Sequence, residues 1–303
     1  MTGNTGNTGN TGNTGNTGNV GIAGGEGGWF LADRVDLPFV TVLDPNNNPI
    51  SNQRRTLAAF PDRSWSARWN AWLVLDDFVV TDWKPTAKAV LDPILAAATA
   101  TAASIAAEID DLVTAAQNER ADALGEILSQ DVEFFSDFMG LLSMSPGSHP
   151  KTYRVLHIAS LIGSFAALHF KGTYNRVRAS QLCPALLPPV PLPGHASFPS
   201  GHSTQAHLMA LCVGRVLTQA VNKPPPANPP PPANLPQQDC DVLKTDLGAL
   251  ADRVARNREI AGLHYASDSA GGVALAQSVL ATLAGMAATS FAVAITNATE
   301  EWP

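Results

Sequence analysis

Alanine-rich stretches with leucine, isoleucine or valine at three- and four-residue steps run through this chain from about residue 87. Alanine has the highest helix propensity, and this spacing places the larger apolar side chains on one face of a helix. Hydrophobic residues make up 45% of the chain but aromatic residues only 7%, so helix-forming aliphatic residues dominate its apolar content. With 303 residues, the chain can bury a sizeable core. The sequence therefore predicts an all-α helical bundle, formed by residues 20–303 as one domain.

The predicted core helices fall into a few apolar-periodic stretches. The pattern over residues 87–142 indicates two helices or more, with Pro93 near the start of the first and a break at 118–122. Further helices are predicted over 153–176, 203–221, 241–264 and 267–295. The last stretch has no charged residue between positions 271 and 295. Its alanine, glycine, serine and threonine content suits a helix buried among other helices, so no stable membrane span is expected.

Two segments of low complexity lie outside the predicted helices. Residues 2–19 are six copies of Thr-Gly-Asn, which offer no apolar side chain to bury. Residues 1–19 are therefore expected to be a disordered tail. Residues 223–236 contain eight prolines, and proline removes a backbone donor and fixes φ. This segment is predicted to be an extended surface insert.

Three tryptophans follow one another at helical spacing near the N-terminus of the bundle. Trp65, Trp69 and Trp72 are separated by steps of four and three, which places them on one helical face. Core packing is the expected role of this stripe. A subunit contact is the alternative, which leaves a homo-oligomer open.

Charge and cysteine content exclude several classes of protein. The net charge of −7 argues against a binder of nucleic acid or of anionic membranes, which would present a basic face. The odd number of cysteines, without metal-ligand spacing, predicts free or buried thiols rather than disulfides: Cys183, Cys212 and Cys240. Met1 leads into the polar repeat instead of a basic and then apolar run, so no signal peptide is expected and the cytoplasm is the default location.

Two short clusters in the second half of the chain supply groups that suit an oxyanion. Lys171 and Arg178 are seven residues apart, close enough to converge on one ligand. In Pro199-Ser200-Gly201-His202, glycine lets the backbone approach a ligand, and serine can donate through its hydroxyl and its amide. A helix that starts directly after this turn would point its free amides at the same place. Taken alone, the first cluster is usually a solvated pair and the second an ordinary helix cap.

A third cluster combines a histidine with a carboxylate. His264 and Asp268 are at positions i and i+4, so the carboxylate can hold one ring nitrogen and fix the tautomer. The other nitrogen is then an oriented nucleophile or ligand. Arg258 lies six residues upstream, and Gly262 between them is a point where the backbone can come close to a ligand.

In order and spacing, the three clusters resemble the signature of the superfamily that unites type 2 phosphatidic acid phosphatases, bacterial class A acid phosphatases and vanadium haloperoxidases. That signature is Lys-x6-Arg-Pro, then Pro-Ser-Gly-His, then Ser-Arg-x3-Gly-x-His-x3-Asp. Two positions depart from it: Ala179 replaces the proline and Asn257 replaces the first serine. Neither supplies charge or the nucleophile, so only local effects are expected. The resemblance covers about residues 160–300 and implies a soluble bacterial member with the superfamily's helical bundle.

The resemblance also implies a role for each position. The residues that would bind the non-bridging oxygens of phosphate or vanadate are Lys171, Arg178, Ser200, Gly201 and Arg258. His264 would attack phosphorus to form a phosphohistidine, held in place by Asp268, and His202 would protonate the leaving alkoxide. Three cations and two further donors around one oxyanion are the electrostatic preorganisation that phosphoryl transfer needs.

The signature does not separate a phosphatase from a haloperoxidase. Vanadate has the shape and charge of phosphate, so the same cage could hold it as a cofactor with His264 as the metal ligand. The substrates would then be hydrogen peroxide and bromide or chloride. His195, five residues before Ser200, favours this reading, because algal bromoperoxidases carry a histidine beside the cofactor. The modest chain length favours the phosphatase, since haloperoxidases are usually longer. Leu168, three residues before Lys171, also favours it, because it is not the tryptophan or arginine that haloperoxidases tend to place near the metal.

Three functions therefore stay open. The first is a metal-independent phosphatase that needs no cofactor and hydrolyses small-molecule phosphate monoesters. The second is a vanadium-dependent haloperoxidase, and the third is a non-catalytic anion-binding protein. Lipid phosphatases proper are disfavoured, because they need several membrane spans.

Overall fold

The computed structural model describes residues 45–47, 60–61, 65–223, 235–286 and 289–303, and these contain helices and no strand. The predicted all-α fold is confirmed for these residues. The Thr-Gly-Asn repeat and most of the proline-rich segment lie outside them. The elements are α3 (Ala67–Val79), α4 (Trp83–Ala98), α5 (Ala102–Asn118), α6 (Arg120–Val132), α7 (Phe135–Leu141), α8 (Pro150–Tyr174), α9 (Ala179–Leu182), the 3₁₀ turn η3 (Pro184–Leu186), α10 (Gly201–Val221), α11 (Gln237–Ile260), α12 (Ala266–Gly285) and α13 (Ser290–Thr299).

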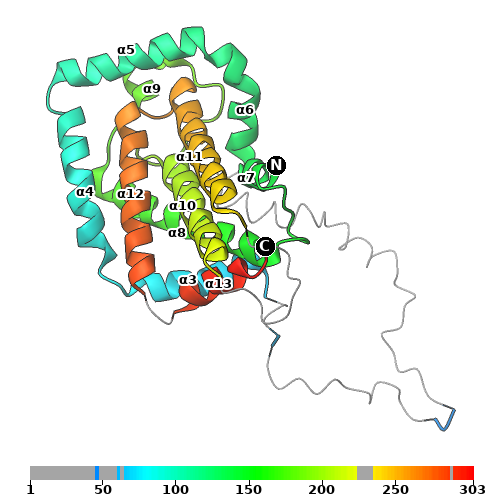
Figure 1. The fold of residues 1–303 in the computed structure, drawn as a ribbon. Coiled ribbons are helices and arrows are strands. Elements are labelled where there is room, and N and C mark those ends of the chain that lie inside the picture. The colour runs from blue at the N-terminus through cyan, green and yellow to red at the C-terminus, as the bar shows by residue number, and fades with distance from the viewer. Residues whose placement is uncertain (1–44, 48–59, 62–64, 224–234, 287–288) are drawn as a thin grey trace.

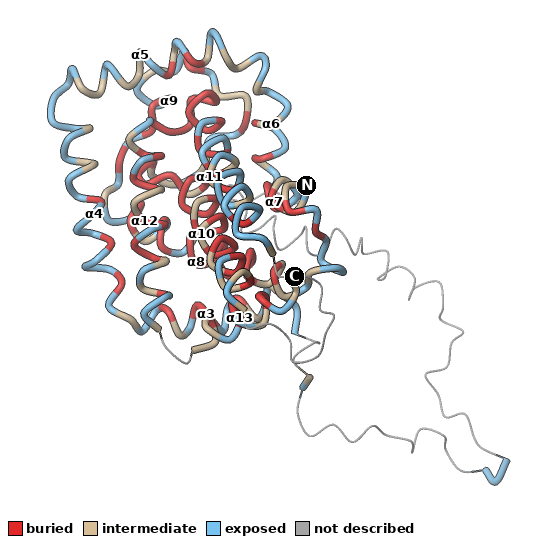
Figure 2. The backbone as a smooth tube through the Cα atoms, in the orientation of Figure 1, coloured by how far each residue is buried: buried red, intermediate tan, exposed pale blue. Residues whose placement is uncertain are grey.

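Helix α10 is the centre of the bundle. It packs against α8, α11, α12 and α13, while α4 covers α12 and α3 packs against α8. Figure 1 shows α5 crossing one end of the bundle, with α3 and α13 at the other end. Buried residues are concentrated on α8, α10 and α12, as Figure 2 shows. The apolar stripes that predicted these helices therefore face one another around α10.

Four helix ends meet at the end of the bundle that α5 covers. Helix α11 finishes and α12 begins there (Figure 1), and the end of α8 and the start of α10 line the same cavity as they do. The three sequence clusters lie at these four ends, although they span about a hundred residues. The fold therefore brings the clusters together at one place.

Several predicted boundaries differ from the structure. The stretch 87–142 forms four helices, α4 to α7, and the first begins at Trp83, so Pro93 lies inside α4 and not near its start. The junction of α5 and α6 falls at Glu119, inside the predicted break. The break between α4 and α5 was not predicted, because the alanine-rich pattern runs through it.

Two further boundaries bear on the site. Helix α11 ends at Ile260 rather than His264, because Gly262 has φ +77°, a left-handed conformation that turns the chain. Helix α12 ends at Gly285 and is followed by α13 at an angle of 95°, so residues 271–295 are not one helix. Among the described residues one helical stretch, Pro150–Leu182, is apolar and long enough to cross a membrane, or three if each of two bent helix pairs formed one span. Inside the protein, 67% of the apolar window of Pro150–Leu182 is buried.

The predicted core role of the tryptophan stripe is wrong. Trp65, Trp69 and Trp72 are 37%, 57% and 48% exposed. Helix α3 instead buries a second stripe against α8, which includes Ala71 and Val74. These smaller side chains allow a close approach of the two helices, which bulky indoles would prevent. The alternative role in a subunit contact stays a prediction.

The cysteines are free thiols, as predicted. Cys212 and Cys240 are buried, and Cys183 is partly exposed. Burial raises the pKa of the Cys212 thiol to about 12, so this group stays protonated and unreactive near neutral pH.

A buried histidine outside the candidate site makes the fold sensitive to acid. The ring of His157 packs 4.8 Å from that of Phe135 and 4.6 Å from that of Tyr153. Burial, and next the charge of Arg68, lowers the pKa of His157 to about 4. The same histidine titrates near pH 6.5 in an unfolded chain, so the unfolded state takes up the proton first as the pH falls.

We expect this difference to lower the free energy of unfolding by roughly 2 kcal/mol between pH 7.5 and pH 5. His157→Leu should remove that part of the pH dependence. Urea denaturation of both proteins at the two pH values measures it. An equal loss of stability in the wild type and the variant would contradict the assignment.

Candidate active site

A small cavity lies where the four helix ends meet. Its volume is about 20 Å³, enough to admit a small ligand group. Six of the nine residues predicted for the site lie in its wall: Lys171, His195, Gly201, His202, Arg258 and His264. The other three, Arg178, Ser200 and Asp268, lie behind the wall and contact residues of it. Leu168 also lines the cavity and is 48% exposed, which places it at the mouth.

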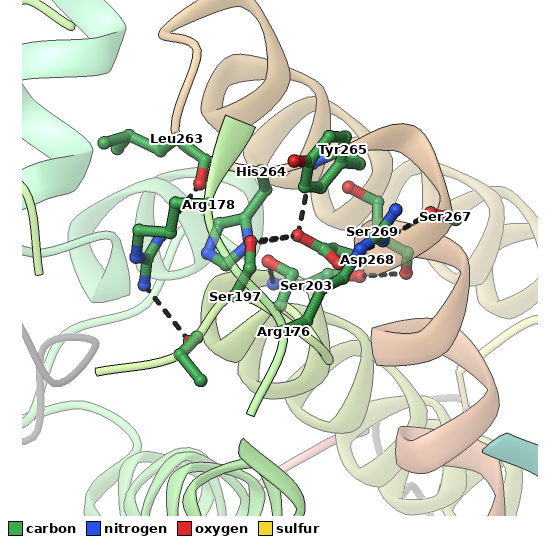
Figure 3. A network of polar contacts seen from close by, with 12 residues as sticks. Arg176, Arg178, Ser197, Ser203, Leu263, His264, Tyr265, Ser267, Asp268 and Ser269 are labelled. Carbon is green, nitrogen blue, oxygen red and sulfur yellow. Dashed lines mark hydrogen bonds and ion pairs between the residues drawn. The ribbon is translucent and has the colours of Figure 1, made fainter. Parts of the chain in front are cut away.

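Asp268 orients the imidazole of His264 (Figure 3). Helix α12 begins at Ala266, so Asp268 is in its first turn and its carboxylate points back toward the residues that precede the helix. Its Oδ2 accepts hydrogen bonds from His264 Nδ1 at 3.0 Å, from the Tyr265 amide at 3.2 Å and from the hydroxyl of Ser197. A carboxylate can only accept, so Nδ1 of His264 carries the proton. The lone pair of His264 is therefore on Nε2.

Arg176 supports Asp268 from behind and was not predicted. Its Nη1 donates to Asp268 Oδ1 at 2.7 Å and its Nη2 to Glu108 Oε2 at 2.8 Å, which links α12 to α5. Burial alone would raise the pKa of Asp268, but the hydrogen bond from His264 and the charge of Arg176 hold that pKa well below its usual range. Asp268 is therefore ionised at neutral pH. The only sequence signal for Arg176 was its basic side chain within the spacer between Lys171 and Arg178.

Lys171 lies in the last turn of α8 and is buried. Its Nζ donates to the carbonyl of Ser197 at 2.7 Å and to that of Ala196 at 3.0 Å. An ammonium has three donors, so one remains for a ligand in the cavity. Burial, and next the charge of Arg178, lowers the pKa of Lys171. Negative charge in the cavity would oppose that shift.

Arg178 is placed behind the wall rather than on it. Helix α8 ends at Tyr174 and Asn175 adopts a left-handed conformation, so Arg178 does not continue the helical face of Lys171. Its guanidinium donates to the carbonyls of His195 at 3.0 Å and Leu263 at 2.8 Å, and to His195 Nδ1 at 3.0 Å. His195 Nδ1 also lies 3.1 Å from the carbonyl of Ala196, so this nitrogen either accepts from the guanidinium or donates to that carbonyl. Arg178 thus ties two segments of the wall together.

Arg258 is the most deeply buried cation of the wall, with no exposed surface. It lies in the last turn of α11, and its Nη2 donates to the carbonyl of Ile127 at 2.7 Å. Its Nε and Nη1 have no hydrogen-bond acceptor within the part of the chain that the structure describes. The nearest carboxylate oxygen is Asp131 Oδ1, at 3.5 Å from Nη1. Burial lowers the pKa of Arg258 to about 10, so it is still a cation at neutral pH.

The turn at residues 199–202 is both a helix cap and part of the wall. Ser200 is the N-cap of α10, and its hydroxyl accepts from the Ser203 amide at 3.3 Å. Gly201 lines the cavity beside Lys171. His202 Nε2 donates to the carbonyl of Gln130 at 3.2 Å, because a carbonyl can only accept. Burial, and next the charges of Arg258 and His264, lowers the pKa of His202, so the ring is neutral at neutral pH.

The two departures from the superfamily signature lie outside the wall. Asn257 donates to Glu126 at 3.0 Å and to the side chain of Gln130 at 2.9 Å, which joins α11 to α6. The backbone carbonyl of Gln130 accepts the hydrogen bond from His202, so Asn257 helps to position that acceptor. Ala179 is buried in the first turn of α9.

Compared with known protein families and with curated proteins, the chain matches no family model and no curated protein. The resemblance to the phosphatase and haloperoxidase superfamily therefore rests on the three clusters alone. The geometry of the cavity is independent of that resemblance.

Proposed function

We propose that this chain is a phosphatase that hydrolyses phosphate monoesters without a metal ion, through a phosphohistidine intermediate on the bundle of the acid phosphatase and haloperoxidase superfamily. The proposal rests mainly on the buried guanidinium of Arg258. Two of its nitrogens have no acceptor in the described residues, and Arg258 lines a cavity that Lys171 also lines. A buried cation is costly unless it is paired and hydrogen-bonded. Asp131 supplies a counter-charge at 3.5 Å, and a bound tetrahedral oxyanion would supply the hydrogen-bond acceptors that Nε and Nη1 lack.

The two histidines divide the chemistry in this proposal. His264 Nε2 attacks phosphorus, an N–P bond forms, and the P–O bond to the alkoxide breaks. Since His202 Nε2–H is donated to the carbonyl of Gln130, the protonated ring gives the proton on Nδ1 to the leaving oxygen, and Nδ1 later removes a proton from the water that hydrolyses the phosphohistidine. Negative charge from the bound phosphate opposes the lowered pKa of His202, so substrate binding favours the protonated ring. Lys171, Arg258 and the amides at the start of α10 stabilise the charge on the phosphoryl oxygens.

A vanadium haloperoxidase is the second candidate, and the position of His195 favours it. This histidine lies in the cavity wall, and its Nδ1 lies 3.0 Å from Arg178, so its ring is held beside the place that an oxyanion would occupy. Vanadate fits the same donors as phosphate, with His264 Nε2 as its ligand and Arg258 and Lys171 neutralising its charge. When bound, it would supply the activation of hydrogen peroxide for the oxidation of bromide or chloride.

One set of assays distinguishes these functions. The full chain is purified beside His264→Ala as a matched control for contaminating enzymes. A phosphatase releases phosphate from an aryl phosphate in the presence of a chelator, is inhibited by vanadate, and shows no turnover in His264→Ala. A haloperoxidase is inert until vanadate is added and then brominates a phenolic dye with peroxide and bromide.

Two results would overturn the proposed catalysis. Equal hydrolysis by the wild type and His264→Ala would assign the activity to a contaminant. Tight vanadate binding without turnover in either assay would favour a non-catalytic anion-binding protein.

A further inference from the structure

A carboxylate lies in the wall of the oxyanion cavity, at a position that none of the three clusters includes. Asp131 is near the end of α6, and its side chain is 13% exposed. It lines the cavity together with His202, Lys171 and Arg258, and its Oδ1 lies 3.5 Å from Arg258 Nη1. Within the described part of the chain, it is the only acidic residue in that wall.

Asp131 is the ion-pair partner of Arg258, but neutralising a buried arginine does not by itself require a carboxylate in the cavity wall. Arg176 is also buried, and its partners Asp268 and Glu108 lie behind the wall. An ionised carboxylate only accepts hydrogen bonds and carries the same sign of charge as a bound oxyanion. Facing a fully deprotonated oxyanion, Asp131 would repel it, and like charges in contact cost several kcal/mol.

The two charges are compatible if the ligand brings a proton. We propose that Asp131 makes the cavity select tetrahedral oxyanions that carry a hydroxyl, such as hydrogen phosphate, vanadate or the monoanion of a phosphate monoester. The ligand hydroxyl donates to Asp131, while the other oxygens accept from Arg258, Lys171 and the start of α10. Sulfate has the same shape but no proton at neutral pH, so it leaves Asp131 facing a bare oxygen. This inference rests on the proposed function, because it needs an oxyanion in the cavity.

The difference in affinity between phosphate and sulfate should be large. Phosphate can donate a hydrogen bond to Asp131, whereas sulfate is repelled by it. Sites built to pair with a hydroxyl reject analogues that lack it by about 10⁴-fold. Asp131 is slightly exposed, and water weakens the repulsion. We therefore expect phosphate to bind at least about 10²-fold more tightly than sulfate.

Calorimetric titration of the full chain with phosphate and with sulfate, at neutral pH and equal ionic strength, tests the inference. In Asp131→Asn the amide can donate to a bare oxygen, so the ratio of the two affinities should fall at least tenfold. Asp122→Asn is the matched control, because Asp122 is exposed on the same helix and loses the same charge. Its ratio should stay at the wild-type value.

The possible results separate this inference from the proposed function. Equal binding of the two anions by the wild type, or an unchanged ratio in Asp131→Asn, overturns the selectivity and leaves the oxyanion site intact. Binding of neither anion overturns the site and the selectivity together. If Asp131→Asn fails to fold, the wild-type ratio alone decides, because a ratio near one contradicts a selective carboxylate.

Discussion

Replacing Asp268 with asparagine is expected to lower turnover by about 10⁴-fold, the loss seen when a carboxylate that orients a catalytic histidine becomes an amide. The carboxylate holds the proton of His264 on Nδ1 and leaves the lone pair on Nε2. An asparagine amide can donate to Nδ1 and so favour the other tautomer. Nε2 would then carry the proton, so it could neither attack phosphorus nor bind vanadate.

The same substitution should also destabilise the fold. Asp268 has no exposed surface and pairs with Arg176, so the amide leaves a buried guanidinium with one carboxylate fewer. Breaking a buried pair costs about 3–5 kcal/mol, and the retained ion pair with Glu108 at 2.8 Å puts the expected cost near the lower end. Urea denaturation measures the loss of stability, and initial rates on an aryl phosphate measure the loss of turnover.

Glu108→Gln separates the two effects. It removes the outer carboxylate of Arg176 but does not touch His264, so it should destabilise the protein while turnover stays within about tenfold of wild type. If Asp268→Asn also kept its turnover within about tenfold of wild type, the tautomer of His264 would not matter for the reaction.

The sequence predicted where helices form better than which face of a helix is buried. Alanine-rich periodicity is a local property, and it correctly predicted an all-α fold for the described residues. Helix α3 carries both the stripe of Trp69 and that of Ala71, and only the shape of α8 decides which is buried. Sequence spacing contains no information on that shape. The turn after α11 was missed for a related reason, since a single Gly262 ends a helix only where the chain must turn.

For the site, motif spacing brought together residues that the fold also places around one cavity. It did not indicate that Arg178 donates to backbone carbonyls while Arg258 keeps two nitrogens without an acceptor in the described residues. Arg176 and Asp131 were missed because their roles depend on α5 and α6, whose contacts with the site are long-range. Such contacts follow from packing, which a single sequence does not specify.

Replacing Gly272 with alanine is expected to destabilise the protein by roughly 3 kcal/mol, the upper part of the range for overpacking a core. A Cβ at this position of α12 would lie 2.6 Å from Ser203 Cβ and 2.9 Å from the carbonyl oxygen of Ser200. The carbonyl of Ser200 belongs to the backbone, so it cannot rotate away from the new Cβ as a flexible side chain could. The helix would have to move off the turn that begins α10.

That movement should reach the cavity as well. Two hydrogen bonds join α12 to the start of α10: Ser200 N to the carbonyl of Asp268 at 2.9 Å, and Ser203 Oγ to that of Ser269 at 2.8 Å. Separating the helices lengthens both and shifts His202, on α10, relative to His264. We therefore expect Gly272→Ala to weaken phosphate binding at least tenfold, measured by the same calorimetric titration.

Gly248→Ala is the matched control for this prediction. Gly248 lies inside α11, and a Cβ there would meet nothing within 4 Å. Alanine is favoured over glycine in a helix interior by up to about 1 kcal/mol, so this variant should be more stable than the wild type. The same chemical change is thus expected to have opposite signs at two helical glycines. If Gly272→Ala were also stabilising, close packing of α12 on the Ser200 turn could not be what holds the two histidines in register.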